Sequence, residues 1–304
     1  MKTACIVLPT YGEADNVRVL IPQIFALTSS TSGYELHVLV VDDGSPDGTQ
    51  RVVEELMPSY PHLHLSTGRE EGLGVAYRRG FDHALRVLRA DLVVQMDADL
   101  QHSPDLIPLF LDLAGRGYGV VIGSRFAPGG ATPQLSAYRR AMSRVGNALV
   151  RRLGGLPPLH DCTSGFRCID AVFLRRCDFS LLATRGYAFQ TSLLSELLRN
   201  GARPIEVPMT FGERTYGVSK LSLRDELEFL ANVLRLPLRR FVAWARAVAR
   251  RLAARPGRAS GARRAPSQRR DAAAIEPGAA ARADAPLGTL PRREAGDRRA
   301  GAVA

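Results

Sequence analysis

Short apolar runs that end in acidic residues recur through the first 125 residues, and they constrain the fold more than any other feature of the chain. HVLVV is followed by Asp42 and Asp43, and LVVQM is followed by Asp97. Strands buried on both faces read as continuous apolar runs of this kind. Stretches with helical apolar spacing separate the runs, so the pattern predicts an α/β fold with a mainly parallel sheet flanked by helices.

The apolar runs give the approximate bounds of six strands. We expect strands over residues 4–8, 36–41, 62–66, 92–96, 120–123 and 204–211. Amphipathic stretches between them predict helices, and further helices are predicted over residues 136–153 and 187–200. Ligands of open α/β sheets bind beyond the carboxyl ends of the strands, so the acidic residues there are candidate site residues.

The net charge of +11 lies at the C-terminal end of the chain. From Arg239 onward there are 16 Arg and 5 acidic residues, whereas the residues before it carry 25 basic and 25 acidic side chains. A nucleic-acid-binding or scaffold protein would carry such an excess on its folded face. The charge therefore argues against nucleic acid as the partner of the motif-bearing region.

Composition divides the chain into three parts. Residues 1–221 are predicted to form the folded α/β domain, 222–255 amphipathic helices, and 256–304 a disordered tail rich in Arg, Ala and Pro. Around Trp244, one helical face is apolar and the opposite face carries arginines, as in helices that lie in a membrane surface. Packing of this helix on its own domain or on a partner is the open alternative.

Two further observations bear on the compartment. No apolar run reaches the roughly 18 residues that a spanning helix needs, so the chain is not expected to cross a bilayer. The four cysteines have no C-x-x-C spacing, and no signal-peptide pattern opens the chain. We therefore expect a reducing, cytoplasmic compartment, with the cysteines as small core residues.

Asp97 and Asp99, in the segment DADLQH, give the most specific chemical signal. Two carboxylates one residue apart at a strand end can share a hard divalent cation, and Gln101 adds a neutral oxygen. A helix cap or a solvated turn is the alternative for such a pair alone. His102 is predicted to be a structural, hydrogen-bonding histidine rather than a ligand.

Two loops after earlier strands carry weaker signals. In DDGSPDGT, Asp43 can accept hydrogen bonds from a nucleobase or ribose, although an ordinary turn with an N-capped helix also fits. In LPTYGE, Tyr11 can stack on a base and Glu13 can accept from its edge. Both loops are therefore predicted to face a nucleotide.

Seven ordered motifs together resemble glycosyltransferase family 2, most closely its dolichol-phosphate or polyprenol-phosphate mannose synthases. They are VLPTYGEADNV, VVDDGSPDGT, GLGVAYRRGF, DADLQH, GSRF, SGFR and FGERTYGVSKL, and the resemblance covers about residues 3–235. The resemblance implies a GT-A fold, a GDP-mannose donor, Mg²⁺ or Mn²⁺, and a polyprenyl-phosphate acceptor.

The resemblance also implies roles for individual residues. The donor-binding set is Pro9, Tyr11, Glu13, Val41, Asp43, Asp97, Ala98, Asp99, Arg125, Arg214 and Lys220. The metal ligands are Asp97, Asp99 and Gln101, and the acceptor phosphate is gripped by Arg125, Arg139 and Ser143. Of these, Asp99, Arg125 and Arg139 are predicted to be catalytic.

The chemistry of the residues agrees with this assignment. A divalent ion with Arg214 and Lys220 would stabilise the departing diphosphate. A phosphate monoester, with a second pKa of about 6, is already ionised and attacks without a protein base. Arginine forks such as Arg125 and Arg139 would offset the repulsion between the two anions.

The sequence thus predicts inverting transfer of mannose to a polyprenyl monophosphate by an enzyme on the cytoplasmic face of a membrane. A small membrane-anchoring partner protein is an open alternative for its attachment. UDP-glucose or another nucleotide sugar is the nearest alternative donor. A hydroxyl acceptor is the second alternative, and it would need a carboxylate base.

Overall fold

The structure is a computed structural model that describes residues 1–182 and 186–213. The predicted amphipathic helices over 222–255, the tail over 256–304, and the site residues Arg214 and Lys220 lie outside the described residues. No helix in the described part of the chain is long and apolar enough to span a membrane.

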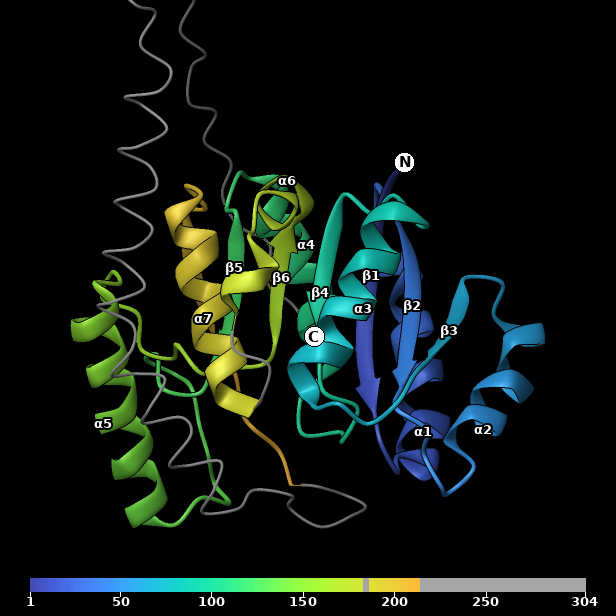
Figure 1. The fold of residues 1–304 in the computed structure, drawn as a ribbon, viewed down its shortest axis with the longest axis horizontal. Coiled ribbons are helices and arrows are strands. Elements are labelled where there is room, and N and C mark those ends of the chain that lie inside the picture. Colours follow the sequence, from blue (N-terminus) through green and yellow to red (C-terminus); the bar gives the residue numbers. More distant parts are fainter. Residues whose placement is uncertain (183–185, 214–304) are drawn as a thin grey trace, which may run out of the picture. The chain divides into compact units, whose positions relative to one another are not determined.

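A seven-stranded sheet forms the centre of the described chain (Figure 1). Its strand order is β3-β2-β1-β4-β6-β5-β7. The strands span Lys2–Thr10 (β1), Tyr34–Asp42 (β2), Leu63–Thr67 (β3), Leu92–Gln95 (β4), Val120–Ser124 (β5), Arg167–Asp170 (β6) and Pro204–Pro208 (β7). All neighbours are parallel except β6, which runs antiparallel to both β4 and β5.

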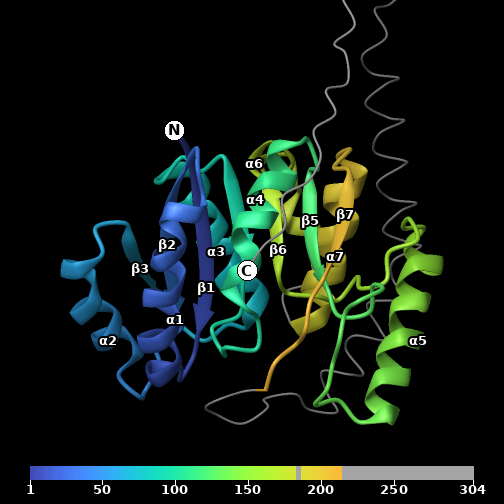
Figure 2. The same ribbon diagram turned by 180° about the vertical axis from the view of Figure 1, so that it is seen from behind.

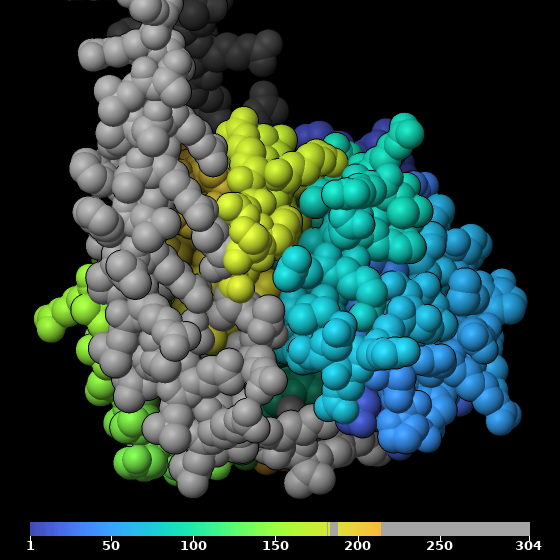
Figure 3. Space-filling model, in the orientation of Figure 1, coloured from blue at the N-terminus to red at the C-terminus, as the bar shows by residue number. Residues whose placement is uncertain are grey.

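Helices cover both faces of the sheet, as Figures 1 and 2 show from opposite sides. The helices that pack against one face are α1 (Ala14–Ala26), α2 (Thr49–Leu56) and α4 (Ile107–Gly115). Those on the other face are α3 (Leu73–Arg86), α5 (Ala137–Gly154), α6 (Ala171–Arg175) and α7 (Gly186–Arg199). In Figure 3 the teal residues of α3 lie beside the yellow residues of the α6 and α7 region. Stacking of Tyr77 on Phe189, with ring centroids 5.6 Å apart, joins α3 to α7.

The predicted fold class is confirmed, and all six predicted strands are present within a few residues of their expected ends. The antiparallel strand β6 was not predicted, because its four residues follow a turn-rich stretch and include Arg167. The four cysteines are buried and unpaired, as expected. Since β6 runs opposite to its neighbours β4 and β5, the residues just before β6 lie at the edge of the sheet where β4 and β5 end.

Candidate active site

Loops from six of the seven strands meet along one edge of the sheet. This is the lower edge in Figure 1, where the arrowheads of β1 and β2 point. From one side to the other, the strand order brings in the loops after β2, β1 and β4, then the loop before β6, and then those after β5 and β7. Every described site residue except Arg139 and Ser143 lies in these loops or at the strand ends beside them.

The loops after β1 and β2 are held together by side chains of the second loop. Three backbone N–H groups of the first loop donate to them. These bonds join Gly12 to Ser45 Oγ, Glu13 to Thr49 Oγ1 and Ala14 to Asp47 Oδ2, at 2.9, 3.0 and 2.9 Å. The two motifs that sequence patterns treat separately therefore form one rigid wall.

Asp42 and Asp43 have different environments although they are neighbours. Asp42 is fully buried and accepts hydrogen bonds from Gly44 and from both the N–H and the hydroxyl of Ser45. Burial alone would raise the pKa of Asp42, but these bonds hold it below its ordinary value. Asp42 is thus a loop-forming residue, and Asp43 is the carboxylate left for a ligand at this strand end.

Asp43 is paired with Arg79 of α3, whose Nη2 lies 2.6 Å from Asp43 Oδ1. Burial raises the pKa of Asp43, and Arg79 opposes this rise without cancelling it. Arg79 also donates to the carbonyl of Asp42, at 3.2 Å. Its side chain is 24% exposed, and its guanidinium places a cation beside the predicted nucleoside-binding carboxylate.

The remaining predicted nucleoside residues lie at the same place. Pro9 and Val41 are register partners in adjacent strands. Tyr11 is half-buried, and a hydrogen bond with Glu70 raises the pKa of its phenol. Glu13 accepts a 2.5 Å hydrogen bond from Asn16, which orients its carboxylate. The structure therefore gathers Pro9, Tyr11, Glu13, Val41 and Asp43 at the ends of β1 and β2.

The Asp97–Asp99 pair follows β4, next to β1 at the centre of the sheet. The hydroxyl of Tyr77 donates to Asp97 Oδ1 at 3.1 Å, and the backbone N–H of Gln101 donates to Asp99 Oδ1 at 3.2 Å. Leu100 has a φ of +63°, a left-handed conformation that is costly for a residue with a side chain. Such strain is typical of loops whose geometry serves a site.

Space beside the Asp97 carboxylate depends on a glycine of another segment. A Cβ atom placed on Gly165 would lie 3.1 Å from Asp97 Oδ2 and 3.5 Å from Oδ1. A side chain there would occupy the approach to this carboxylate. Two neighbouring carboxylates with no side chain at position 165 beside them fit a hard divalent cation, which prefers oxygen ligands and keeps water or phosphate among them.

The flanking residues of the Asp97–Asp99 pair have structural roles. Ala98 packs in the core and is 3% exposed. His102 is buried against Phe166, with ring centroids 5.1 Å apart, and its Nδ1 faces the backbone N–H of Asp97 at 3.3 Å. Burial lowers the pKa of His102. A neutral ring whose Nδ1 accepts from the backbone matches the structural role predicted for it.

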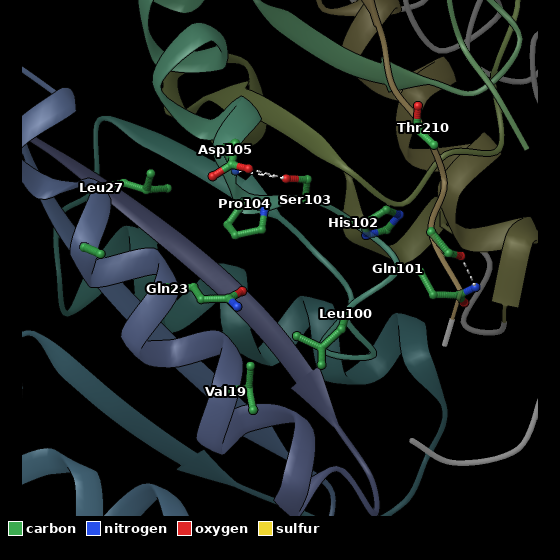
Figure 4. Close-up of a pocket in the computed structure, with 12 residues that line it drawn as sticks. Val19, Gln23, Leu27, Leu100, Gln101, His102, Ser103, Pro104, Asp105 and Thr210 are labelled. Atoms are coloured by element: carbon green, nitrogen blue, oxygen red, sulfur yellow. Dashed lines mark hydrogen bonds between the residues drawn. The ribbon is translucent and has the colours of Figure 1, made fainter. Parts of the chain in front are cut away.

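Gln101 joins the metal motif to the chain that leads toward Arg214. Its amide nitrogen donates to the carbonyl of Gly212 at 3.1 Å, and the Gly212 N–H donates back to the Gln101 carbonyl at 2.9 Å (Figure 4). The amide oxygen of Gln101 is then its remaining acceptor. This reciprocal pair fixes the start of the FGERTYGVSKL motif against the Asp97–Asp99 loop.

A groove of about 690 Å³ lies behind this loop, toward α1. Figure 4 shows its lining, from Val19 and Gln23 of α1 to His102 and Thr210. Gln101 lines the groove, but Asp97 and Asp99 do not. The groove therefore lies beside the carboxylate pair and does not contain it. We place the candidate active site at the two carboxylates and not in the groove.

Arg125 forms a buried ion pair that the sequence did not predict. Its Nε and Nη2 lie 2.7 and 2.9 Å from the two carboxylate oxygens of Asp161, and Nη2 also donates to Thr163 at 2.8 Å. Burial alone would raise the pKa of Asp161, but Arg125 holds it below its ordinary value. Arg125 is 8% exposed, so its position is fixed before any phosphate arrives.

Arg139 and Ser143 lie one turn apart on α5 and not in the strand-end loops. Ser136 caps this helix by accepting from the backbone N–H of Arg139 at 3.3 Å. Arg139 is exposed, and Ser143 is half-buried. Figure 1 shows that α5 begins at the same lower end as the strand-end loops. Of the residues predicted to bind the acceptor phosphate, Arg125 is thus buried and Arg139 is exposed.

Tyr77, Arg79, Asp161 and Gly165 are site residues that sequence reasoning missed. Gly165 stands inside the motif SGFR, which marked the segment without giving its role. Arg167 of that motif is fully buried and donates to the carbonyls of Cys162 and Gln190, at 2.8 and 2.7 Å. It therefore fixes the segment 162–167 that carries Gly165.

Residues 5–176, more than half of the chain, match the sequence profile of glycosyl transferase family 2. The chain belongs to this family of glycosyltransferases, as the ordered motifs predicted. It is 36% identical over 248 residues to the polyprenol monophosphomannose synthase of Mycolicibacterium smegmatis, covering 81% of this chain and 91% of that protein.

Two further relatives carry similar names. The undecaprenyl-phosphate mannosyltransferase of Micrococcus luteus is 38% identical over 234 residues, covering 75% of this chain and 91% of that protein. The dolichol-phosphate mannosyltransferase of Pyrococcus furiosus is 33% identical over 236 residues, covering 76% of this chain but only 62% of that protein. This chain therefore matches about three fifths of the archaeal protein's length.

Solved structures share the fold. Mannosyl-3-phosphoglycerate synthase from Rubrobacter xylanophilus superposes with a TM-score of 0.56 at 25% identity, covering 81% of this chain and 76% of its own. Glucosyl-3-phosphoglycerate synthase from Mycobacterium tuberculosis, solved with Mn²⁺, uridine diphosphate and phosphoglyceric acid, gives 0.56 at 19% identity, with 78% of each chain covered. At such identity, the second likeness shows the GT-A-like fold alone.

Proposed function

We propose that this glycosyltransferase moves mannose from GDP-mannose to a polyprenyl monophosphate, with inversion, giving a β-linked polyprenyl phosphomannose. The observation that carries the proposal is the position of the Asp97–Asp99 pair, between the two hydrogen-bonded loops after β1 and β2 and the Arg125–Asp161 pair. The names of the three relatives support the sugar and the lipid acceptor.

The loops after β1 and β2 would bind the nucleoside. Tyr11 offers a half-buried ring for stacking, and Asp43 offers a carboxylate beside the Arg79 cation. Because hydrogen bonds between the loops fix this wall before the donor binds, little ordering entropy is lost on binding. Donor affinity is then set mainly by contacts with the base and ribose.

The donor diphosphate would lie over Asp97 and Asp99. A bound Mg²⁺ or Mn²⁺ supplies positive charge that stabilises the leaving diphosphate. Asp97 and Asp99 would hold that ion, with the Gln101 amide oxygen as a third donor, and Gly165 keeps the approach open. Tyr77 orients Asp97 by donating to Oδ1.

The acceptor side favours a phosphate over a hydroxyl nucleophile. A hydroxyl acceptor needs a carboxylate that takes its proton, whereas a phosphate monoester is already charged at neutral pH. Asp161 is paired with Arg125, which holds its pKa below the ordinary value and makes it a poor base, and Asp43 is paired with Arg79 on the nucleoside side of the site. Arg139, exposed at the start of α5, is the cation that we assign to the lipid phosphate, on an enzyme lying on the cytoplasmic face of the membrane.

Labelled donors test the proposal directly. The full chain is incubated with a polyprenyl phosphate, Mg²⁺ or Mn²⁺, and either radiolabelled GDP-mannose or UDP-glucose, and the lipid phase is extracted. We expect mannose label in the lipid phase, released by mild acid as expected for a glycosyl phosphate. Glucose label alone in the lipid phase would show that the donor is UDP-glucose and not GDP-mannose. Label found only on a saccharide or protein hydroxyl would overturn the proposed phosphate acceptor.

A further inference from the structure

Four of the chain's six histidines gather at the end of the sheet opposite the active site. They are His37 on β2, His62 just before β3, His64 on β3 and His83 on α3. Glu35 is two residues before His37 and therefore points to the same face of the sheet. Leu39 and His64 are register partners, so β2 and β3 present these side chains on the face that α3 covers.

The contacts within the cluster centre on His37. Its Nε2 lies 3.1 Å from Glu35 Oε2, and its Nδ1 lies 2.9 Å from His64 Nε2. His62 Nε2 approaches the other oxygen of Glu35 at 3.7 Å. One ligand atom each from Glu35, His37 and His62 can be chosen so that all three lie within 4.8 Å of one another.

We propose that Glu35, His37 and His62 form a binding site for a divalent transition-metal ion of the Zn²⁺ type. Two imidazoles and a carboxylate are ligands that Zn²⁺ commonly takes, with bonds of about 2.0–2.2 Å. Tetrahedral geometry with such bonds separates the ligand atoms by about 3.3 Å. His37 Nε2 lies 3.1 Å from Glu35 Oε2, which is close to that value, and His62 Nε2 lies 3.7 Å from the other oxygen, Oε1. With one ligand atom from each residue, all three lie within 4.8 Å of one another, so a small movement of the exposed His62 would complete the site.

His64 is the positioning residue of this site. When His37 binds the ion through Nε2, its proton moves to Nδ1, which then donates to His64 Nε2 at the observed 2.9 Å. A ligating histidine in proteins almost always donates its second N–H to such a partner. The side chain of His37 is 12% exposed and is therefore held in place, whereas that of His62 is 44% exposed and can adjust.

The ion would connect two strands at the edge of the sheet. The carbonyl of His62 already accepts from the Val38 N–H at 2.9 Å, and this bond aligns the start of β3 with β2. β3 has a neighbour on one side only in the described sheet. Glu35 and His37 precede Asp43 by several residues of extended strand, so the ion would lie at a site separate from the Asp97–Asp99 pair. An ion that binds the folded chain there would raise its stability.

Zinc titration of the full chain tests the proposal. The variant D97N/D99N removes the acidic active-site pair, so that Zn²⁺ binding there does not interfere. Isothermal titration of this chelator-treated variant at pH 7.5 is expected to give one Zn²⁺ per chain. Adding His62→Gln should weaken binding at least about 100-fold, and His64→Gln about tenfold. Co²⁺ in place of Zn²⁺ should give the visible absorption of a tetrahedral site.

His160→Gln is the matched control. His160 also pairs with a glutamate, its Nδ1 lying 2.8 Å from Glu206 Oε2, but no third ligand in the described residues joins them. Its loss should leave Zn²⁺ affinity and the Zn²⁺-induced rise in Tm unchanged. Absence of saturable binding by D97N/D99N, or equal affinity with and without His62→Gln, would overturn the proposal. Both outcomes leave the proposed sugar transfer untouched.

Discussion

The two halves of the active-site edge are built differently. In the proposed donor half, the loops after β1 and β2 are joined by three bonds from backbone N–H groups, and Asp43 has its arginine at 2.6 Å. In the proposed acceptor half, the described residues place one arginine in a buried ion pair and another on the exposed first turn of α5. A soluble nucleotide can be met by a rigid wall, whereas a lipid phosphate must be reached at an open surface.

The largest expected effect concerns the centre between the halves. D97N/D99N keeps the side-chain volumes and removes two charges, so mannosyl transfer should fall by at least about 1000-fold. Product formation is measured with saturating Mg²⁺ or Mn²⁺, and the near-UV circular dichroism spectrum is the folding control. Retained transfer would show that the carboxylate pair is not the metal site.

The next effect tests the rigid part of the acceptor half. Asp161→Ala leaves Arg125 buried without its counterion, which should lower the free energy of unfolding by about 3–5 kcal/mol. Urea denaturation measures the loss. Asp112→Ala is the control, because its ion pair with Arg116 is exposed and should contribute less than about 1 kcal/mol.

The same pair predicts a dependence on pH. The folded chain holds the pKa of Asp161 below its ordinary value. As the pH falls, Asp161 is therefore protonated in the unfolded chain before it is protonated in the folded chain. The stability from this group is therefore fully present above about pH 4 and is lost as pH falls below it. Wild type and Asp161→Asn should differ in unfolding free energy by a constant amount between pH 5 and 7, and converge only in stronger acid.

Arg139→Ala tests the exposed part of the acceptor half. Loss of this cation should reduce transfer to the lipid by about 10- to 100-fold, through the acceptor and not through the KM for GDP-mannose. The Tm should not change, because the side chain is exposed. Arg144→Ala, on the same helix, is the control for general charge, and full activity of Arg139→Ala would favour a hydroxyl acceptor.

The smallest expected effect concerns the space beside Asp97. Gly165→Ala places a methyl group 3.1 Å from Asp97 Oδ2, so the metal concentration for half-maximal activity should rise by about tenfold. Gly115→Ala makes a similar contact, 3.2 Å from the Tyr34 hydroxyl, away from the site. It should leave metal activation unchanged, and an equal rise in both variants would contradict the role of Gly165.

Local patterns in the sequence account for much of the fold and half of the site. Apolar runs predicted six strands, because burial of both faces requires continuous apolar residues. Strand β6 was not predicted, because its four residues begin with Arg167 and carry no such pattern. Asp97, Asp99 and Asp43 could be found because each stands at the end of a predicted strand, where ligands of such sheets bind.

What the sequence could not give is the pairing of charges from distant segments. Arg125 looked like a cation for phosphate, and the structure binds it to Asp161, 36 residues away. Glu35, His37, His62 and His64 are unremarkable along the chain until β2 and β3 pair. Local composition determines strands and their acidic ends, but the register between strands decides which side chains meet, and therefore which charges are neutralised and which can hold a ligand.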